Sequence, residues 1–429
     1  MSNFTLIGAT LADGTTANIE VADGLILSVG TEQSGEAIDA TGLVALPGFV
    51  DLHTHLREPG FEQSETVRTG SMAAARGGYT AVHAMANTHP VADTAGVVEQ
   101  VKALGDEAGY VQVQPIGAVT VGLDGEQLAE LGAMADSKAK VRVFSDDGKC
   151  VHDPLLMRRA LAYVKNFGGV IAQHAQEPRL TNNSQMNEGV VSAELGLAGW
   201  PAVAEESIIA RDVLLAEAAG SRIHICHLST AGSVEIIRWA KARGINVTAE
   251  VTPHHLLLTD ELARSYDPVY KVNPPLRTEK DVLALRQALI DGTIDIIATD
   301  HAPHPDESKD CEWNAAAFGM LGLETAASIA QLVLIDSGKS DWTRLAQVMS
   351  TKPAEISGIE GQGATLKPGA PANITLIDPT AKRVINGGGA SKSSNQPFEG
   401  MTLPGNVVHT IFRGAFTVRD SKLVERGNS

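Results

Sequence analysis

Eight short apolar runs recur along the middle of the chain, at residues 48–55, 78–85, 111–118, 140–147, 169–175, 222–229, 246–253 and 295–301. Between them lie stretches whose apolar residues repeat near every 3.6 positions, such as DTAGVVEQVKALGDEAG, PLLMRRALAYVKNFGG and AGSVEIIRWAKARG. The runs are typical of buried strands and the stretches of amphipathic helices. Eight strand–helix units predict the α/β class and a (β/α)8 TIM barrel over residues 50–364.

The two ends of the chain follow another pattern, in which apolar and polar residues alternate between Gly and Asp turns. It is seen in NFTLIGATLADGTTANIEVADGLILSVG, ANITLIDPTAKRVI and VVHTIFRGAFTVRDSKLV. This alternation predicts antiparallel strands. Because neither flank alone is long enough for a core, we expect residues 1–49 and 365–429 to pair into one small β-sandwich domain. The stretch NGGGASKSSNQPFEG is expected to form a loop.

Composition narrows the class of protein. Lys and Arg number 34 against 51 Asp and Glu, a formal charge of −17 that disfavours nucleic acid as a partner. No apolar run approaches the roughly 18 residues of a membrane helix, so we expect no membrane association and a cytoplasmic location. Cys150, Cys226 and Cys311 are too scattered for a disulfide framework. Cys226 is expected to be a packed thiol that faces outward beside His224.

Five of the apolar runs end in residues of a metal-binding type. Successive side chains on a strand point to opposite faces, and one alternating register in each run leads from apolar residues to a polar end. The carboxyl ends of barrel strands form one rim, so the pattern predicts a metal site there. Its candidate ligands are His53, His55, Asp147, His174, His227 and Asp300.

Each ligand also has a simpler interpretation. The pair His53 and His55 alone is a weak motif, and single histidines such as His174 and His227 are commonly structural residues of the core. Asp146 competes with Asp147, but it shares the register of Arg142 and Phe144 and should face the helices. The matching registers favour a site over these alternatives.

Imidazole nitrogen and carboxylate oxygen are ligands that zinc prefers. Six ligands exceed one tetrahedron, so we expect two Zn²⁺ ions: one held by His53, His55 and Asp300, the other by His174 and His227, with Asp147 between them. This arrangement predicts hydrolytic chemistry on a small-molecule substrate. Asp300 could also take a proton from the attacking water, or serve as a ligand only.

Further polar residues lie near the same rim. Arg57 adds a cation and His304 a hydrogen-bond donor for an anionic substrate, while Asn87 and Asn273 either bind substrate or cap turns. The segment HPDESKDCEWNAAAFG could close over the site as a lid, or it could be a plain surface loop. As a lid it would let Phe318 and Gly319 offer backbone groups to the ligand. The default role of the neighbouring histidines is support of the ligands: His152, His254, His255 and His301.

The motifs PGFVDLHTHLREPG, MANTHP, FSDDG, CHLSTAGSV, AEVTPHHL, KVNPPLR and ATDHAPHPDESK resemble the cyclic amidohydrolases of the amidohydrolase superfamily, most closely type I dihydroorotases of bacteria. The resemblance covers residues from about 47 to 325. It implies a binuclear zinc barrel, with the six candidate residues as ligands and Asp300 also as proton shuttle. It further implies substrate contacts from His55, Arg57, Asn87, Asn273, His304, Phe318 and Gly319.

The implied reaction is the reversible cyclisation of N-carbamoyl-L-aspartate to L-dihydroorotate in pyrimidine biosynthesis. Many relatives bridge their metals with a carboxylated lysine, whereas Asp147 occupies that position here, which favours type I. Thr54 and Ala86 also depart from the family pattern, but neither removes a ligand.

Two alternatives stay open at this point. The first is a hydantoinase or allantoinase, whose substrates have no ring carboxylate and so need no group to bind one. The second is a non-catalytic scaffold for aspartate transcarbamoylase. A homo-oligomer and an association with aspartate transcarbamoylase are expected from the same resemblance.

Overall fold

The structure, a computed structural model, describes residues 3–387 and 389–426. Its central part alternates strands and helices, and each of the eight predicted runs contains one parallel strand. These strands are β6 (Phe49–Thr54), β7 (Tyr79–Ala84), β8 (Gln112–Pro115), β9 (Val143–Phe144), β10 (Val170–Gln173), β13 (Ile223–Ile225), β14 (Val247–Val251) and β15 (Ile296–Ile297). The strands are shorter than the runs, and β9, β13 and β15 keep only two or three residues.

The parallel strands form two ladders, β6-β7-β8 and β9-β10-β13-β14-β15. Single parallel bridges connect them on both sides, from Gly117 to Phe144 and from Thr54 to His301. In the part of the chain that the structure describes, the hydrogen bonding thus gives two sheets joined by bridges. It does not give one continuous closed ladder.

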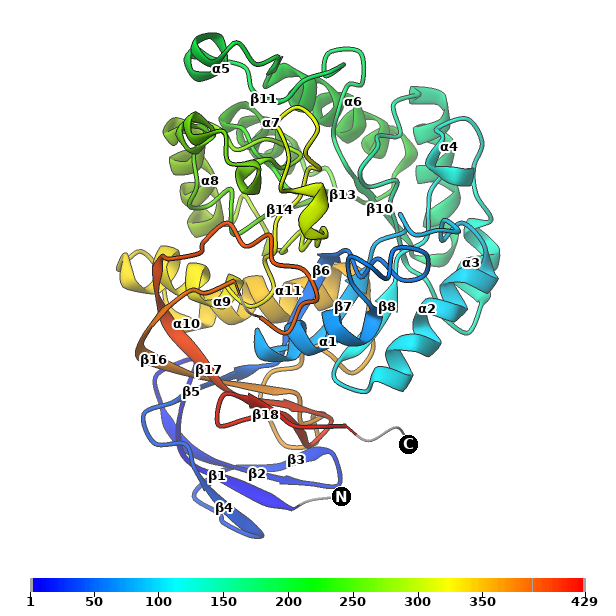
Figure 1. The fold of residues 1–429 in the computed structure, drawn as a ribbon. Coiled ribbons are helices and arrows are strands. Elements are labelled where there is room, and N and C mark those ends of the chain that lie inside the picture. The colour runs from blue at the N-terminus through cyan, green and yellow to red at the C-terminus, as the bar shows by residue number, and fades with distance from the viewer. Residues whose placement is uncertain (1–2, 388, 427–429) are drawn as a thin grey trace.

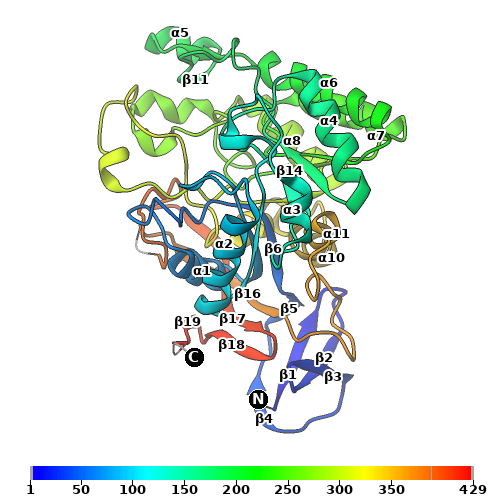
Figure 2. The same cartoon turned by 90° about the vertical axis from the view of Figure 1, so that its right-hand side faces the viewer.

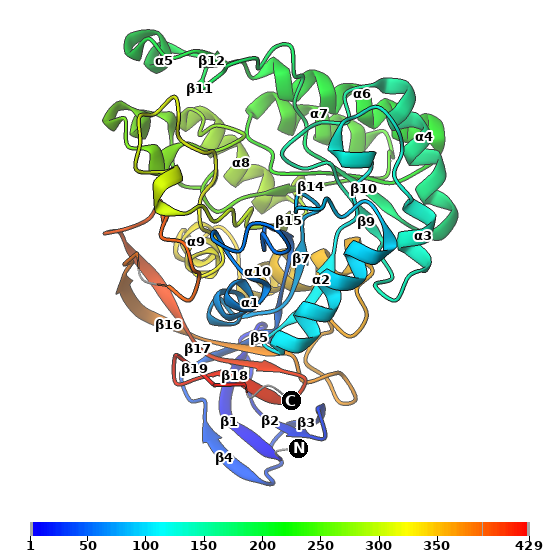
Figure 3. The same ribbon diagram turned by 45° about the vertical axis from the view of Figure 1, so that its right-hand side comes forward.

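Helices surround these strands (Figure 3). They are α1 (Val67–Arg76), α2 (Ala95–Ala108), α3 (Leu131–Asp136), α4 (Pro154–Val164), α5 (Val190–Leu195), α6 (Val203–Ala219), α7 (Ala231–Ala242), α8 (Glu279–Asp291), α9 (Ala326–Ala330), α10 (Trp342–Ala346) and α11 (Lys352–Ser357). Helix α4 shows why the sequence forms them: Pro154 begins it, and the Asp153 side chain caps it by accepting from the Leu156 amide (2.7 Å). Its apolar stripe, which includes Met157 and Leu161, is buried.

Shorter elements complete the central part. Strands β11 (Met186–Asn187) and β12 (Gly199–Trp200) pair with each other. The π-helical turns are η6 (Gln331–Asp336) and η7 (Gln347–Thr351). The 3₁₀ turns are η1 (Val121–Leu123), η2 (Lys165–Phe167), η3 (Asp260–Ser265), η4 (Pro268–Tyr270) and η5 (Asp306–Ser308). No helix of the described residues has the length and apolar character needed to cross a membrane.

Both ends of the chain build one sheet, which lies below the central part in Figure 1 and is seen from the side in Figure 2. Its strands are β1 (Phe4–Leu11), β2 (Thr16–Ala22), β3 (Leu25–Gly30), β4 (Glu36–Asp39), β5 (Val44–Pro47), β16 (Ile374–Val384), β17 (Thr402–Phe412), β18 (Ala415–Arg419) and β19 (Lys422–Leu423). The two flanks meet where β5 pairs antiparallel with β16. The described hydrogen bonds make one nine-stranded sheet, so the two-layer sandwich of the sequence prediction is not visible in the pairing.

A small apolar cluster draws residues from strands of both parallel ladders: Leu52, Met85, Ile116, Val143, Val170, Ala172, Cys226, Ile296, Ala298 and Ile356. Ile223 and Ile225 belong instead to the larger cluster shared with the helices. The predicted outward register of Cys226 is therefore wrong, because the strand registers of β13 are the reverse of those expected. Cys226 is a packed thiol all the same, 2% exposed.

Candidate metal centre

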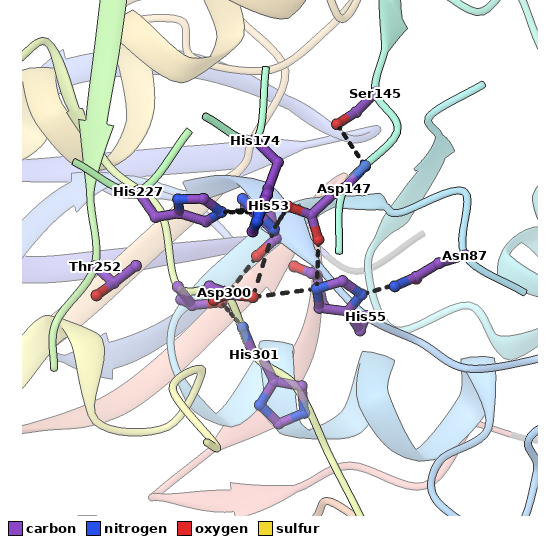
Figure 4. Close-up of polar contacts among 12 residues, drawn as sticks. His53, His55, Asn87, Ser145, Asp147, His174, His227, Thr252, Asp300 and His301 are labelled. Carbon is purple, nitrogen blue, oxygen red and sulfur yellow. Dashed lines mark hydrogen bonds and ion pairs between the residues drawn. The ribbon is translucent and has the colours of Figure 1, made fainter. Parts of the chain in front are cut away.

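The six predicted ligands come together at the carboxyl ends of the parallel strands (Figure 4). His53 is the last residue but one of β6 and His55 directly follows that strand. Asp147, His174, His227 and Asp300 each follow a strand by one to three residues. Because the strands are parallel, these ends share one rim. All six side chains are buried.

Asp147 lies at the centre of the group. Its Oδ1 is 3.3 Å from His53 Nε2, and its Oδ2 is 3.2 Å from His55 Nε2. Asp300 completes this half, with Oδ1 3.4 Å from His53 Nε2 and 3.1 Å from His55 Nε2. Four ligand atoms within reach of one another can hold one metal ion.

The second half of the group shares Asp147. Its Oδ1 lies 3.2 Å from His174 Nδ1 and 3.3 Å from His227 Nε2. The two histidine nitrogens are 2.8 Å apart. This is a second set of ligand atoms that can converge on a cation, and Asp147 belongs to both sets.

Backbone conformation explains how His227 reaches the site against its strand register. His227 has φ +31° and Asp300 has φ +45°. Both lie in the left-handed region, which residues other than glycine rarely adopt. The turn at His227 directs its ring to the side on which the Cys226 side chain already lies. Strained conformations of this kind cluster at functional sites, since the surrounding structure must hold them.

Asp146 faces away from the group, as its register predicts. Its Oδ1 accepts from the backbone amides of Val119 (2.8 Å) and Thr120 (3.0 Å), and its Oδ2 accepts from the Thr120 hydroxyl. Asp146 therefore ties the end of β9 to the loop after β8, while Asp147 faces the histidines.

Sequence reasoning missed Glu250, a fully buried carboxylate in β14. Glu250 Oε1 accepts from His53 Nδ1 (2.7 Å) and from the His227 amide (3.1 Å), and its Oε2 lies 2.9 Å from His224 Nε2. The bond fixes the His53 tautomer so that Nε2 faces the carboxylates. The available signal was a lone carboxylate within the apolar strand VTAEV.

Two amides orient other histidines in the same way. Asn87 Oδ1 accepts from His55 Nδ1 (2.9 Å), and Gln176 Oε1 accepts from His174 Nε2 (2.8 Å). The opposite nitrogen of each ring is left to face Asp147. Asn87, predicted as a substrate contact, thus directly supports His55, and Gln176 was missed by the sequence analysis.

The electrostatics of the group favour a cation. Burial would raise the pKa of Asp147, but His53 and the hydrogen bonds from His174 and His227 hold it well below its usual value. Burial would also raise the pKa of Asp300, which His53 and His55 lower to about 2. Burial opposes charge on His53, yet Asp147, Asp300 and Glu250 raise its pKa well above the usual range.

These residues fit a metal. Two ionised carboxylates face four imidazole nitrogens, and His53 Nε2 is a buried nitrogen with no hydrogen-bond partner among the described residues. A divalent cation would satisfy it and the excess negative charge together. The chemistry of this donor set suits zinc.

The residues expected to bind substrate lie beside the metal centre. Arg57 Nη2 is 3.3 Å from His304 Nε2, which in turn is 2.8 Å from the Phe318 carbonyl oxygen. Burial lowers the pKa of Arg57 to about 10 and the pKa of His304 to about 3, so at neutral pH the first is charged and the second neutral. At Gly319, φ is +150° and an added Cβ would lie 2.8 Å from His304 atoms, so only glycine fits.

Asn273 lies next to the His174 side of the centre. Its Nδ2 donates to Gln176 Oε1 (3.2 Å), and its Oδ1 is buried with no hydrogen-bond partner in the described part of the chain. A buried acceptor left unsatisfied is costly. A donor on a bound ligand would satisfy it.

Asn395, in the predicted Gly/Ser/Asn-rich loop, also reaches this region. Its Nδ2 donates to the carbonyl oxygens of Ala302 (3.0 Å) and Gly319 (3.1 Å), while its Oδ1 accepts from the His304 amide (3.1 Å). One side chain from the C-terminal part thus fixes both His304 and Gly319. Composition alone gave no signal for this role.

The remaining histidines differ in place. His255 is held by Thr252 Oγ1 (2.7 Å), and His301 lies 3.5 Å from the Glu65 carboxylate. His254 is fully buried, with neither ring nitrogen bonded to the described residues, and burial lowers its pKa to about 4. His152 is exposed. No hydrogen bond among the described residues joins the His152 ring to a candidate ligand, so a supporting role for His152 stays a prediction.

We expect Glu250→Gln to lower metal affinity by about 10- to 100-fold, the usual effect of losing an outer partner of a metal-binding histidine. Glutamine cannot keep the negative charge that holds His53 and His224. Competition with a chromogenic chelator would measure the affinity. Glu205→Gln is the matched control, since Glu205 is also buried but bonds to Ser229 and Ser233; equal affinities of the two variants would contradict the role of Glu250.

Comparison with protein families gives a match to a model described as Dihydro-orotase-like over residues 42–233. The dihydroorotase of Streptomyces coelicolor is 66% identical over 427 residues, 99% of this chain and 100% of that protein. The dihydroorotase of Mycobacterium tuberculosis is 55% identical over 416 residues, 96% and 97% of the two chains.

Solved structures of related fold are also found. The L-hydantoinase (dihydropyrimidinase) of Arthrobacter aurescens superimposes with a TM-score of 0.89 at 26% identity, covering 100% of this chain and 98% of that chain. The dihydropyrimidinase of Brevibacillus agri gives a TM-score of 0.84 at 24% identity, covering 98% and 96%. The second likeness shows the fold alone.

Proposed function

The chain belongs to the dihydroorotase family, and from this premise we propose how its residues catalyse the reversible cyclisation of N-carbamoyl-L-aspartate to L-dihydroorotate. The chain is a cyclic amide hydrolase. The observation that carries the function is 66% identity to a dihydroorotase over nearly the whole of both chains. Asp147 and the five side chains around it agree with this function, since none of the six candidate ligands is missing.

We propose that the centre holds two zinc ions, one between His53, His55 and Asp300 and one between His174 and His227. Asp147 would serve both, because it faces all four histidine rings. Asp147 stands where many relatives have a carboxylated lysine, which supports assignment to type I. When bound, zinc supplies Lewis-acid polarisation of the reacting carbonyl and lowers the pKa of water.

The proton transfers fall to Asp300. In hydrolysis, the carboxylate accepts a proton from the attacking water and returns it to the ring nitrogen as the C–N bond breaks; cyclisation reverses these steps. His53 and His55 lower the pKa of Asp300 to about 2, so its carboxylate is ionised in the resting site. His55 and His53 hold its Oδ1 in place at 3.1 and 3.4 Å.

We propose that Arg57, Asn87 and His304 bind the ring carboxylate. Arg57 supplies the charge, and the Asn87 amide nitrogen adds a donor from the neighbouring loop. Asn273 Oδ1 would accept from a ring N–H, which satisfies its unpaired oxygen. The backbone groups of Phe318 and Gly319 line the other side of the ring, and His55 completes the set.

Substrate preference tests this proposal against its rival. The likeness to hydantoinases at 26% identity is weaker than the likeness to dihydroorotases, and their substrates lack the ring carboxylate. Purified protein should turn over dihydroorotate much faster than hydantoin or allantoin. Preference for hydantoin would reject the assignment.

Arg57→Met should raise KM for dihydroorotate by about 10- to 100-fold and change kcat much less, since a hydrogen bond to a charged group contributes about 1.5–3 kcal/mol. Steady-state kinetics would show the split. Any residual turnover of uncharged hydantoin is the internal control, because it should be unaffected. An unchanged KM for dihydroorotate would remove Arg57 from the carboxylate site.

The barrel and the small domain around the site are also part of the proposed organisation. We infer that the eight parallel strands form a (β/α)8 barrel over residues 50–364. Two bridges between the ladders, and an apolar cluster with residues from both ladders, support this inference. Residues 1–49 and 365–429 would form the small domain, as a sandwich or as one curved sheet. A homo-oligomer, an association with aspartate transcarbamoylase and a cytoplasmic location stay predictions.

A further inference from the structure

Two buried lysines fasten the segment after His304 to the segment before Asn273. Lys309 is 9% exposed, and its Nζ donates to the carbonyl oxygens of Pro268 (2.9 Å), Lys271 (3.0 Å) and Ala317 (2.8 Å). An ammonium group has three N–H donors, and all three find acceptors here. Pro268 and Lys271 belong to one segment and Ala317 to the other, so Lys309 spans the two.

Lys271 makes the reciprocal connection. It is 2% exposed, and its Nζ donates to the Trp313 carbonyl (2.7 Å) and more weakly to the Asn314 carbonyl (3.3 Å). The same Nζ lies 4.5 Å from the centre of the Phe318 ring, within cation–π range. The Lys271 carbonyl also accepts from the Gly319 amide (3.0 Å).

Two buried ammonium groups are an unusual way to hold a loop against its neighbour. Burying an ammonium group is costly unless hydrogen bonds compensate for its lost hydration, and apolar side chains would fill the same volume at lower cost. Neither lysine forms an ion pair with a described carboxylate. Their hydrogen bonds to backbone carbonyls therefore specify one relative position of the two segments.

That position is the one on which the substrate contacts depend. Phe318 lies under the Lys271 ammonium, and its carbonyl oxygen receives the His304 hydrogen bond (2.8 Å). Gly319 is bonded to Lys271 on one side and to Asn395 on the other. Asn273, with its unpaired Oδ1, follows Lys271 by two residues.

We propose that Lys309 and Lys271 form a clasp, two positioning residues that hold residues 305–319 against residues 267–273 and so keep the substrate-binding surface assembled. The clasp rests on the proposed function in that Phe318, Gly319 and Asn273 are taken to contact substrate. Without it, the loop would spend part of its time away from the site. The apparent affinity would then equal the intrinsic affinity multiplied by the fraction of molecules that are assembled.

Kinetics of Lys309→Met and Lys271→Met test the clasp. Each variant should raise KM for dihydroorotate by about tenfold or more with kcat changed less than about threefold, because the metal centre is untouched. The double variant should be no worse than about the worse single one, since either change opens the same clasp. Lys367→Met, at an exposed lysine, is the control.

Hydrogen exchange of residues 305–319 gives a second readout that needs no turnover. Exchange in this segment should quicken in both single variants and stay unchanged in Lys367→Met, with exchange in α4 and α7 as in the wild type. A variant with wild-type KM and wild-type exchange in this segment would overturn the clasp, and so would KM effects that multiply in the double variant. If Lys309→Met fails to fold, Lys271→Met decides by the same measurements.

Failure of the clasp and failure of the proposed function are distinguishable. A wild-type protein that does not turn over dihydroorotate would reject the function, while the exchange measurement would still decide whether the lysines hold the segment. Normal wild-type turnover with unaltered variants would reject the clasp alone.

Discussion

Replacing Asp300 by asparagine should lower the turnover of dihydroorotate by about a thousandfold or more, while the chain stays folded and keeps its metal. General acid–base catalysis contributes about 10²- to 10⁴-fold. The asparagine side chain keeps the shape and one oxygen that can face a cation, but it cannot take a proton. Its neighbours His53 and His55 would still lie within reach of that oxygen.

Three measurements separate the roles of Asp300. Turnover, metal content and thermal midpoint should be compared for Asp300→Asn, Asp300→Ala and the wild type. Loss of turnover with metal retained in Asp300→Asn supports the proton role; loss of metal in both variants would make Asp300 a ligand only. Near-normal turnover of Asp300→Ala would remove Asp300 from the mechanism.

Asp147→Asn should deplete the protein of metal and abolish turnover, a larger loss than from any other single ligand. Asp147 faces all four histidine rings at 3.2 or 3.3 Å, and it is the residue common to both sets of ligand atoms. Without its charge, the four imidazoles would lose the anion that holds a cation between them. We expect metal affinity to fall by more than about 100-fold, the upper end of the loss caused by removing a residue that supports a ligand.

The neighbouring residue provides a matched control. Asp146→Asn changes the same side chain one position earlier, where it bonds to Val119 and Thr120. This variant should keep its metal, measured by elemental analysis after dialysis, even if it is less stable. Similar metal loss in both variants would indicate that the substitutions act by disturbing the end of β9.

The sequence predicted the eight strands well because buried parallel strands read as continuous apolar runs. It predicted where the six polar side chains at the ends of five runs would meet, because parallel strands place their carboxyl ends at one rim. Its register argument was right for β10, where Val170, Ala172 and His174 share a face, and wrong for β13. A period-two argument assumes extended backbone, and the positive φ of His227 breaks it.

The residues that the sequence could not predict act across long separations. Glu250 approaches His53 from 197 positions away, and Asn395 approaches His304 from 91. Both support their neighbours through hydrogen bonds that depend on the final packing. Glu250 is marked locally only as a lone carboxylate in an apolar strand, and no local pattern shows which residue either side chain contacts. The burial of Lys271 and Lys309 could not be predicted either, because the sequence does not show whether a lysine is buried or exposed.

We expect these side chains to hold a metal that is needed for the dihydroorotase reaction. The direct measurement is dihydroorotate turnover before chelation, after chelation and after zinc is added back. We predict that turnover is lost with the metal and returns with zinc, at up to two ions per chain. Full turnover in a preparation shown to be free of bound metal would show that the reaction needs no metal at these residues.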